Sequence, residues 1–307
     1  MTMITPSLAA GRRILTAHAL ERHYPDAAGT GSDALALLER VIDAQADLVA
    51  GWLGVGFVHG VMNTDNTAIS GETIDYGPCA FLDEYDPRKT FSSIDRGGRY
   101  AFSHQPRIAL WNVARLAETL LPQLSDDEEA AVRIATERLE RFTARFEDAH
   151  LGVMRKKLGL MRSDDGDGTL VEELLAHLAA NHVDFTLFFR RLSDEVAPAE
   201  QSTIATLFGE GGASFHSWLD AWRSRLATES LAPEAVAGAM RRANPAFIPR
   251  NQRVEEVIEA AVQRDDFAPF ETLVEVLGRP YDDQPEHARL AEPPGPEQGP
   301  YKTFCGT

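Results

Sequence analysis

A mainly α-helical fold with a few short strands is predicted by three features of the sequence. Apolar residues recur at three- and four-residue steps from about Gly11 onward, as on the buried face of a helix. Residues able to cap a helix precede several of these stretches. Between Leu53 and about Ile74, four glycines and short β-type runs at residues 56–58 and 73–74 replace the helical rhythm, and we expect two or three short strands there.

The composition is that of a globular protein. The 307 residues are 44% apolar and 25% charged, which excludes disorder throughout and allows one large domain or two smaller ones. The net charge of −17 argues against nucleic acid or an anionic membrane as partner, since both attract positive charge. The sequence contains no run of about 18 apolar residues and therefore does not predict a transmembrane helix. Two cysteines, Cys79 and Cys305, cannot form a disulfide scaffold, and we expect a cytoplasmic protein.

Three segments are expected along the chain. Residues 1–7 resemble the start of the β-galactosidase α-peptide in cloning vectors, and we interpret residues 1–10 as a vector-derived leader. Residues 11–278 carry the helical patterns. Residues 279–307 hold six of the 17 prolines and predict an extended tail that runs back over the fold, with Tyr301 and Phe304 as apolar anchors.

The helices are expected in the following order. Ser32 caps a helix whose apolar stripe runs from Leu38 to Trp52 and is interrupted by Gln45. A second helix runs from Pro106 to about Leu120. Trp111 and Leu116 are expected on its apolar side. A capping box of Ser125 and Glu128 is expected to open a long helix that buries Val132, Leu139, Phe142 and Phe146.

Three further elements are expected. Thr169 with Glu172 opens another helix, a further helix runs from Asp184 to Leu192, and residues 193–203 form a polar connector.

One motif suggests chemistry. His59 and Asn66 have the spacing of the His and Asn in a protein-kinase catalytic loop. Asp75-Tyr76-Gly77 follows where a kinase has its metal-binding Asp-Phe-Gly after a short hairpin. The amide oxygen of Asn66 and the carboxylate of Asp75 can share one Mg²⁺ with nucleotide phosphates.

The position of the kinase base holds Val61, which cannot accept a proton. By kinase rules this is a pseudokinase, unless Asp65 supplies the carboxylate. A turn cluster without function is the alternative interpretation of this Gly-, Asn- and Asp-rich loop.

Further motifs carry a family resemblance. They are the run from His59 to Pro78, Gly98-Arg99-Tyr100, Asn112, Asp184-Phe185-Thr186, Ile248-Pro249-Arg250-Asn251 and the closing Tyr301-Lys302-Thr303-Phe304-Cys305-Gly306-Thr307. Together they closely resemble the selenoprotein O family of kinase-fold protein adenylyltransferases, also labelled YdiU. The resemblance extends from about Ile14 to the C-terminus.

The resemblance implies a protein-kinase-like C-lobe with family-specific C-terminal helices. It also implies flipped ATP as cofactor and transfer of AMP to Ser, Thr or Tyr hydroxyls of protein substrates. Asp65 matches the family's proposed proton acceptor. Asn66 and Asp75 match the residues that bind Mg²⁺ in the family, and Mn²⁺ can replace Mg²⁺. The resemblance also implies that Asp75 lies near the nucleotide.

The sequence departs from the family pattern at its N-terminal side. The family has a nucleotide-binding N-lobe with a Gly-rich loop and a phosphate-pairing Lys, whereas only 64 residues precede Asp65 here and none of them is lysine. We therefore expect a truncated chain that is weakly active or inactive by itself. Two alternatives stay open: a non-catalytic pseudokinase remnant that binds metal or a partner, and a library-selected fragment with an unrelated hydrolytic activity.

The two cysteines add a redox hypothesis. In this family a C-terminal cysteine or selenocysteine is linked to redox control, and Cys305 matches that position. The loop position of its usual partner holds Phe91 here, whereas Cys79 lies four residues after Asp75. Either Cys79 pairs with Cys305 or both remain reduced thiols.

Overall fold

The computed structural model describes residues 8–29, 31–196, 204–295, 299 and 301–304. The chain forms two compact units. The first contains the described residues up to Ala50 together with Met62–Tyr76 and His104–Ala149, and the second contains Gly51–Val61, Gly77–Ser103 and the described residues from His150 onward. Within the described residues, no helix is long and apolar enough to cross a membrane.

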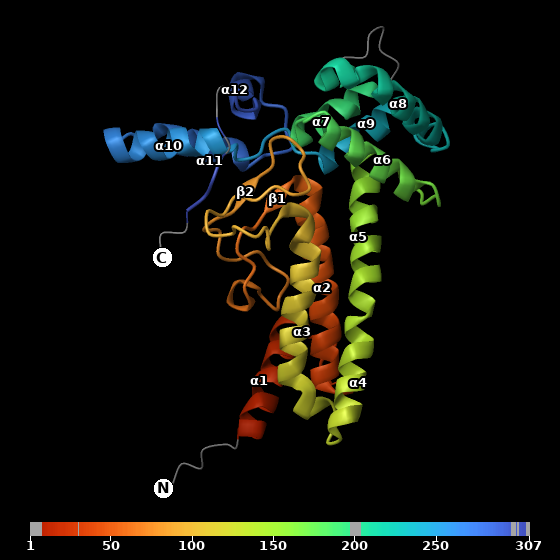
Figure 1. Ribbon diagram of the computed structural model, residues 1–307, viewed down its shortest axis with the longest axis vertical. Coiled ribbons are helices and arrows are strands. Elements are labelled where there is room, and N and C mark those ends of the chain that lie inside the picture. Colours follow the sequence, from red (N-terminus) through yellow and green to blue (C-terminus); the bar gives the residue numbers. More distant parts are fainter. Residues whose placement is uncertain (1–7, 30, 197–203, 296–298, 300, 305–307) are drawn as a thin grey trace. The chain divides into compact units, whose positions relative to one another are not determined.

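Long helices build the first unit (Figure 1). They are α1 (Leu8–His23), most of α2 (Asp33–Val55), α3 (Gln105–Leu124), α4 (Glu128–Leu139) and the first part of α5 (Arg141–Lys157). The predicted cap of α2 is confirmed, because Ser32 Oγ accepts a hydrogen bond from the Leu35 amide at 3.4 Å. Apolar side chains of α2 and α3 form the core of this unit, among them Leu38, Val41, Ile42, Val113 and Leu120.

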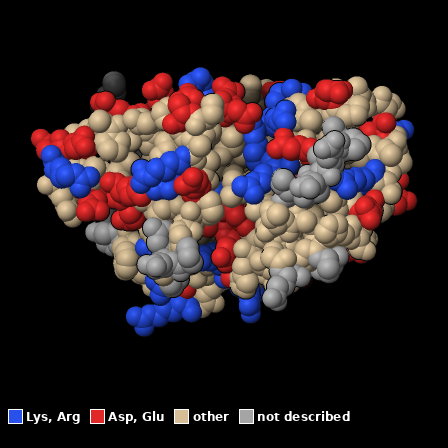
Figure 2. All heavy atoms as spheres, turned by 90° about the horizontal axis from the view of Figure 1, so that it is seen from above, with Lys and Arg blue, Asp and Glu red and all other residues tan. Residues whose placement is uncertain are grey.

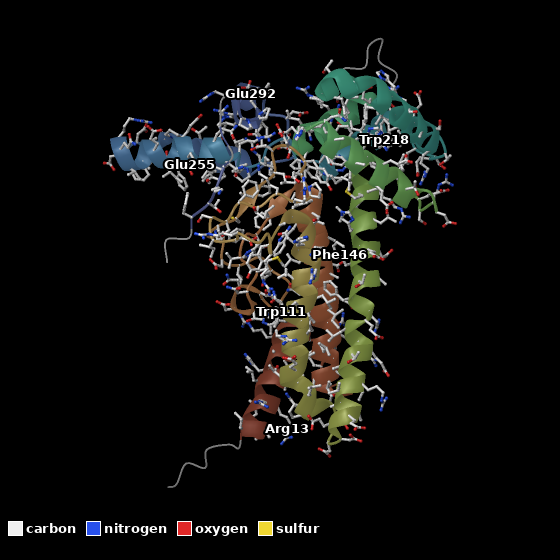
Figure 3. All side chains as sticks on the ribbon, in the orientation of Figure 1. Arg13, Trp111, Phe146, Trp218, Glu255 and Glu292 are labelled. Carbon is white, nitrogen blue, oxygen red and sulfur yellow. The ribbon has the colours of Figure 1, made fainter. Side chains whose placement is uncertain are left out.

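The structure corrects the expected helix faces of the first unit. Trp111, labelled in Figure 3, is 41% exposed and Val132 is 46% exposed, so neither is a core residue. The Trp111 ring instead lies against the Arg115 guanidinium, 5.2 Å from the ring centre. The buried face of α3 combines apolar side chains such as Ile108 and Leu120 with the smaller Ala109 and the polar Asn112. Trp111 therefore does not mark the inward face.

The capping box at Ser125 is also wrong. The cap of α4 is Asp127, whose Oδ1 accepts hydrogen bonds from the amides of Glu129 at 2.9 Å and Ala130 at 3.3 Å. The single long helix expected from here is two helices, α4 and α5, separated at Glu140. Of its predicted core residues, Phe142 is the one that is fully buried.

A small antiparallel sheet belongs to the second unit. Strand β1 (Phe57–Val58) pairs with β2 (Ala80–Phe81), in the register Phe57 to Phe81 and Val58 to Ala80. The strand expected at residues 73–74 is wrong, because the partner of β1 lies further along the chain. The aromatic rings of Phe57 and Phe81 lie 5.3 Å apart and favour this register.

Helices with an aromatic core form much of the second unit. These helices are α6 (Asp167–Ala180), α7 (Phe185–Leu192), α8 (Gly212–Leu226) and α9 (Pro233–Ala243). The buried aromatic residues of these helices and of the 3₁₀ segment η4 (Ile204–Gly211) are Phe185, Phe188, Phe189, Phe208, Phe215, Trp218 and Trp222. The expected helix at Asp184–Leu192 is confirmed, and Asp184 is its cap. The expected start at Thr169 is wrong, since α6 begins at Asp167.

A buried arginine joins three segments of the second unit. Arg250, which is 1% exposed, precedes α10 (Asn251–Arg264). Its Nη1 donates to Asp83 at 2.8 Å and to Asp184 at 2.6 Å. Burial raises the pKa of the Asp83 carboxyl, and Arg250 opposes that shift. On the face shown in Figure 2, acidic and basic side chains are interspersed.

The tail is less extended than expected. After α11 (Ala268–Leu277), the chain forms the 3₁₀ turn η5 (Pro285–His287) and the short helix α12 (Ala288–Ala291). Tyr301 is an anchor, because its ring lies 6.3 Å from Phe91, whereas Phe304 is 76% exposed and is not. Three expected features lie wholly or partly outside the described residues: positions 1–7 of the leader, positions 197–203 of the connector, and Cys305.

Candidate functional site

The residues expected to do chemistry lie on one loop of the first unit. Asp65 and Asn66 belong to the 3₁₀ turn η1 (Thr64–Asn66), which follows Met62 and Asn63. Asp65 is exposed and Asn66 is half-buried. The turn is closed by the Asn66 amide, which donates to the Asn63 carbonyl at 3.1 Å. The Asp65 carboxylate is therefore presented to solvent from a short, hydrogen-bonded turn.

Helix α3 holds the start of this loop through one buried amide. Asn112 is 4% exposed, and its Nδ2 donates to the Met62 carbonyl at 3.1 Å and to Thr67 Oγ1 at 2.8 Å. Thr67 Oγ1 in turn donates to the Asn63 carbonyl at 3.0 Å. These bonds tie together the residues on both sides of Asp65 and Asn66. They restrict the backbone that carries the two candidate side chains.

The end of the loop is held by two further side chains. Gln45 of α2 is 1% exposed, and its Nε2 donates to the Ala68 carbonyl at 2.7 Å. The Tyr24 hydroxyl donates to the Ile69 carbonyl at 2.5 Å. Burial raises the pKa of Tyr24 to about 12, so this hydroxyl keeps its proton at neutral pH. The polar break in the apolar stripe of α2 thus has a structural role as a loop anchor.

Gly71 lets the loop turn close to α2. Its φ is +75°, and a Cβ added there would stand 2.8 Å from the Ala44 Cβ. Any side chain larger than hydrogen would therefore displace the loop end.

Asp75, the second expected metal ligand, lies four residues later. Its side chain is exposed and its backbone is left-handed, with a φ of 54°. Asp tolerates this conformation better than most residues, yet it still costs free energy. Such strain often occurs at functional positions, and here it falls on the residue expected to bind metal.

The structure places Asp65, Asn66 and Asp75 in one unit, whereas His59 belongs to the other. His59 is fully buried, with its ring centre 5.4 Å from that of Trp52. The described residues contain no cluster of three His, Cys, Asp or Glu side chains that could hold a metal ion. Any metal at this loop must therefore rely on the Asn66 amide, water or nucleotide oxygens besides Asp75.

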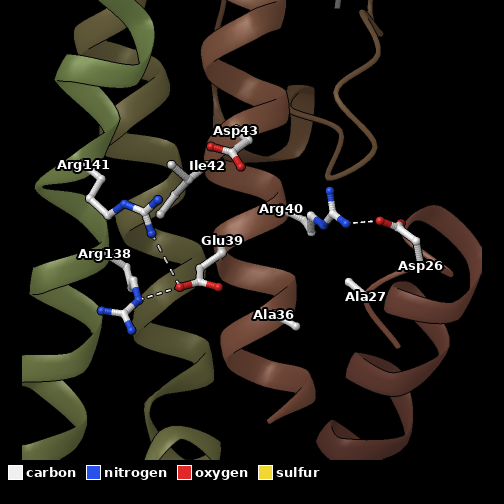
Figure 4. A pocket seen from close by; sticks show the side chains of 9 residues that line it. All are labelled: Asp26, Ala27, Ala36, Glu39, Arg40, Ile42, Asp43, Arg138 and Arg141. Atoms are coloured by element: carbon white, nitrogen blue, oxygen red, sulfur yellow. Dashed lines mark hydrogen bonds and ion pairs between the residues drawn. The ribbon is translucent and has the colours of Figure 1, made fainter. Parts of the chain in front are cut away.

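A pocket in the first unit resembles a phosphate site at first sight, because three arginines line it (Figure 4). Each of these arginines already has a carboxylate partner. Arg138 and Arg141 approach Glu39 at 2.6 and 3.7 Å, and Arg40 pairs with Asp26. None of the three candidate residues lines this pocket. We therefore assign it no part in nucleotide binding.

The sequence interpretation did not identify Tyr24, Gln45 and Asn112 as the side chains that hold the loop in place. Asn112 was noticed only as part of a family resemblance, and Gln45 only as an irregularity in a stripe. Gln45 interrupts an otherwise apolar helix face, and a buried amide needs a polar partner. This interruption was the signal in the sequence that another segment is hydrogen-bonded there.

Comparison with known proteins gives concordant matches. The family model described as "Protein adenylyltransferase SelO" matches residues 7–278. A protein of Bradyrhizobium sp. (strain ORS 278) named "Protein nucleotidyltransferase YdiU" is 55% identical over 295 residues, which are 96% of this chain and 60% of that protein. A protein of the same name from Methylorubrum extorquens is 56% identical over 304 residues, 97% of this chain and 61% of its own length. The chain thus spans about three fifths of the curated relatives that it matches.

Proposed function

The chain belongs to the SelO family of protein adenylyltransferases, and on that premise we propose that it carries the part of a protein AMPylase that activates the acceptor hydroxyl. The reaction is transfer of AMP from ATP to a Ser, Thr or Tyr hydroxyl of a protein. The observation that carries this proposal is the identity of about 55% to proteins named as nucleotidyltransferases, which extends over nearly the whole chain. The fold that we propose for this part is a protein-kinase-like C-lobe.

Asp65 is the proposed proton acceptor. Its carboxylate is exposed on the anchored turn Thr64–Asn66, where a hydroxyl of a protein substrate can reach it. The hydroxyl oxygen forms a bond to the α-phosphorus as the bond from that phosphorus to the bridging oxygen breaks. The hydroxyl proton passes to Asp65, and pyrophosphate leaves.

Asn66 and Asp75 are the proposed metal-binding residues. An amide oxygen and a carboxylate are the hard donors that Mg²⁺ prefers, and the exposure of Asp75 leaves room for water and phosphate oxygens. A metal bound there would neutralise charge on the triphosphate.

Activity is tested most sharply by completing the chain. The chain covers about 60% of these relatives, and the nucleotide-binding N-lobe that the family resemblance implies can be taken from one of them and fused ahead of residue 11. We expect the fusion to transfer labelled AMP from ATP, and the Asp65→Ala and Asp75→Ala fusions to lose that transfer. The full-length relative serves as positive control, and the 307-residue chain is assayed beside it. An inactive fusion beside an active relative would contradict the proposal.

A second candidate function is that of a binding module without catalysis. It is favoured by Val61, which stands where a kinase has its catalytic Asp and cannot accept a proton. This candidate predicts that the fusion binds Mn²⁺ and ATP but transfers no AMP, so the same assay separates the two functions.

A further inference from the structure

A cavity of the second unit is lined mainly by carboxylates. Its volume is about 610 Å³, within the range of small-molecule sites, and residues of α10, of the segment after β2 and of the tail line it. Among the described lining residues, Lys89 carries the positive charge, and the carboxylates are those of Asp83, Glu84, Glu255, Glu256 and Glu259. Such an excess of negative charge in a concave surface favours a positively charged ligand.

Three of these carboxylates already have partners. Asp83 accepts a hydrogen bond from Arg250 at 2.8 Å, and Glu256 accepts one from Arg253 at 2.6 Å. Glu84 lies 3.2 Å from a histidine ring nitrogen. The charge left for a ligand is therefore that of the two remaining glutamates.

Glu255 and Glu259 form no ion pair within the described part of the chain. Both are exposed, and their spacing of four positions makes them neighbours on one side of α10. The Tyr301 hydroxyl donates to Glu255 Oε1 at 2.8 Å and so holds the Glu255 carboxylate, which is labelled in Figure 3. Like charges at this spacing repel each other, and a cation between them would remove that repulsion.

Asn251 adds an acceptor to the same side of α10, one turn before Glu255. This cavity-lining side chain is 5% exposed, and its Nδ2 donates to the Phe81 carbonyl at 3.2 Å and to Asp83 Oδ2 at 3.4 Å. Both partners are acceptors, so they fix the orientation of the amide and leave Oδ1 as its free acceptor. No described residue donates to this Oδ1, and it is not among the side-chain atoms that are closed off from solvent. It is therefore available to a donor in the cavity.

Lys89 does not occupy this position. Its ammonium lies 5.5 Å from the centre of the Phe91 ring and forms no ion pair with a described carboxylate. Phe91 and Tyr301, whose ring centres lie 6.3 Å apart, supply apolar surface to the wall. The cavity thus combines three acceptors in a row with an apolar side.

We propose that this cavity binds two ammonium groups joined by a short alkyl chain. One ammonium lies between Asn251 Oδ1 and Glu255, the other lies between Glu255 and Glu259, and the alkyl chain packs against Tyr301. Positions four apart on a helix are separated by about 6 Å along its axis, a distance that a chain of four carbons covers. The same chemistry belongs to a free diamine and to two lysine side chains of a protein. The proposal does not depend on AMP transfer.

The test uses 1,4-diaminobutane as probe, with ligand-observed NMR titration of the 307-residue chain. The diamine should bind saturably, and n-butylamine, which lacks the second ammonium, should bind about fivefold more weakly. The uncharged 1,4-butanediol should not bind saturably. An acetylated and amidated Lys-Lys dipeptide distinguishes the source of the ligand: binding as tight as that of the diamine indicates a protein, and weaker binding indicates a free diamine.

Loss of negative charge from the wall should weaken diamine binding. The double variant Glu255→Gln/Glu259→Gln keeps an acceptor for Tyr301 and should bind 1,4-diaminobutane about tenfold more weakly. Glu172→Gln/Glu173→Gln is the matched control, because these neighbours on α6 are exposed and do not line the cavity. It removes the same charge from the chain and should leave binding unchanged.

Loss of positive charge from the wall should have the opposite effect. Lys89→Gln removes a competing ammonium from the cavity and should tighten diamine binding about threefold. Lys156→Gln is its control, since Lys156 is exposed on α5 and does not line the cavity. Three results would each overturn the proposal: equal binding of 1,4-diaminobutane and n-butylamine, binding by the cavity glutamate variant like that of its control, or weaker binding by Lys89→Gln.

Discussion

Asn112 and Met62 lie 50 positions apart in the chain and are joined by a buried hydrogen bond from the Asn112 Nδ2 to the Met62 carbonyl at 3.1 Å. The same Nδ2 donates to Thr67 Oγ1 at 2.8 Å. One side chain of α3 thus holds the backbone on both sides of Asp65 and Asn66. The geometry of the candidate catalytic turn depends on a residue that takes no part in the proposed chemistry.

Replacing Asn112 should therefore loosen the turn and destabilise the fold. The Asn112→Ala change removes both donated hydrogen bonds and should lower the free energy of unfolding by about 1–3 kcal/mol. Thr119→Ala is the control on the same helix, because its hydroxyl bonds only to its own helix, and it should cost less than about 0.5 kcal/mol. Urea unfolding measures both. Equal stability of the two variants would show that the bonds from Asn112 contribute little.

Metal binding is expected to depend on Asp75 and Asn66. Asp75→Ala and Asn66→Ala should each weaken Mn²⁺ binding at least about tenfold. Mutating a residue that only hydrogen-bonds to a metal ligand already costs about that much affinity. Calorimetric titration or the paramagnetic relaxation of water protons measures the affinity. The exposed Asp126 of the same unit provides a control through Asp126→Asn. If Asp75→Ala binds Mn²⁺ like the unchanged chain, Asp75 is not a ligand.

The sequence predicted where the helices lie along the chain better than which of their faces are buried. Periodicity located α2 and α3, because an apolar stripe is sufficient to define a helix. It placed Trp111 inside, since pattern reasoning equates large apolar side chains with the core, whereas Trp111 is 41% exposed beside Arg115. Pairing of β1 with residues 80–81 could not be predicted, because two-residue strands carry no alternating pattern.

The candidate site shows the same limit. Asp65, Asn66 and Asp75 were found by their spacing, which is a local property of the sequence. Their anchors come from Tyr24, Gln45 and Asn112, at the far ends of hydrogen bonds that span 23 to 50 positions. Contacts at such separations depend on how the helices pack, and a single sequence does not contain that information.

Burial of Arg250 predicts a large difference between two arginine variants. Arg250→Ala leaves Asp83 and Asp184 without their shared partner and should lower the free energy of unfolding by about 3–5 kcal/mol. Arg241 pairs with Asp194 at the surface, where both side chains are exposed, so Arg241→Ala should cost less than about 1 kcal/mol. Denaturant unfolding compares them. Similar costs for the two variants would argue against a stabilising role of the buried cluster.

Lys157 gives the second unit a pH-dependent stability. Burial lowers the pKa of its ammonium to about 7 from 10.5, although the rings of Phe185 and Phe189, at 5.1 and 4.0 Å, favour the charge. Between these two values the unfolded chain binds a proton that the folded chain has released, so the contribution of Lys157 to stability rises with pH. Lys157→Met should therefore be more stable than the unchanged chain at pH 7.

That advantage should shrink as the pH approaches 10, because Lys157 then becomes neutral in both states. Melting temperatures measured from pH 6.5 to 10 give the comparison. Lys156→Met is the matched control, since Lys156 precedes Lys157 on α5 and is exposed. A stability difference between Lys157→Met and the unchanged chain that does not vary with pH would refute the proposed proton linkage.

The tail brings the redox hypothesis back to the loop after Asp75. Thr303 Oγ1 donates to the Pro78 carbonyl at 2.7 Å, and the Thr303 amide donates to the Phe91 carbonyl at 2.9 Å. Pro78, which precedes Cys79, and Phe91 thus both contact Thr303. Cys305 itself lies outside the described residues.

The redox hypothesis pairs Cys79 with Cys305, and this disulfide would restrain the chain four residues beyond Asp75. It requires Cα atoms within about 7 Å, and in a reducing compartment it would form only as a regulatory bond. If the two cysteines pair, a non-reduced digest after mild oxidation should contain the linked peptides in mass spectrometry, and the Cys79→Ser chain should show only the free Cys305 peptide. The detection of both cysteines solely as free thiols in the oxidised, unchanged chain would contradict the pairing of Cys79 with Cys305.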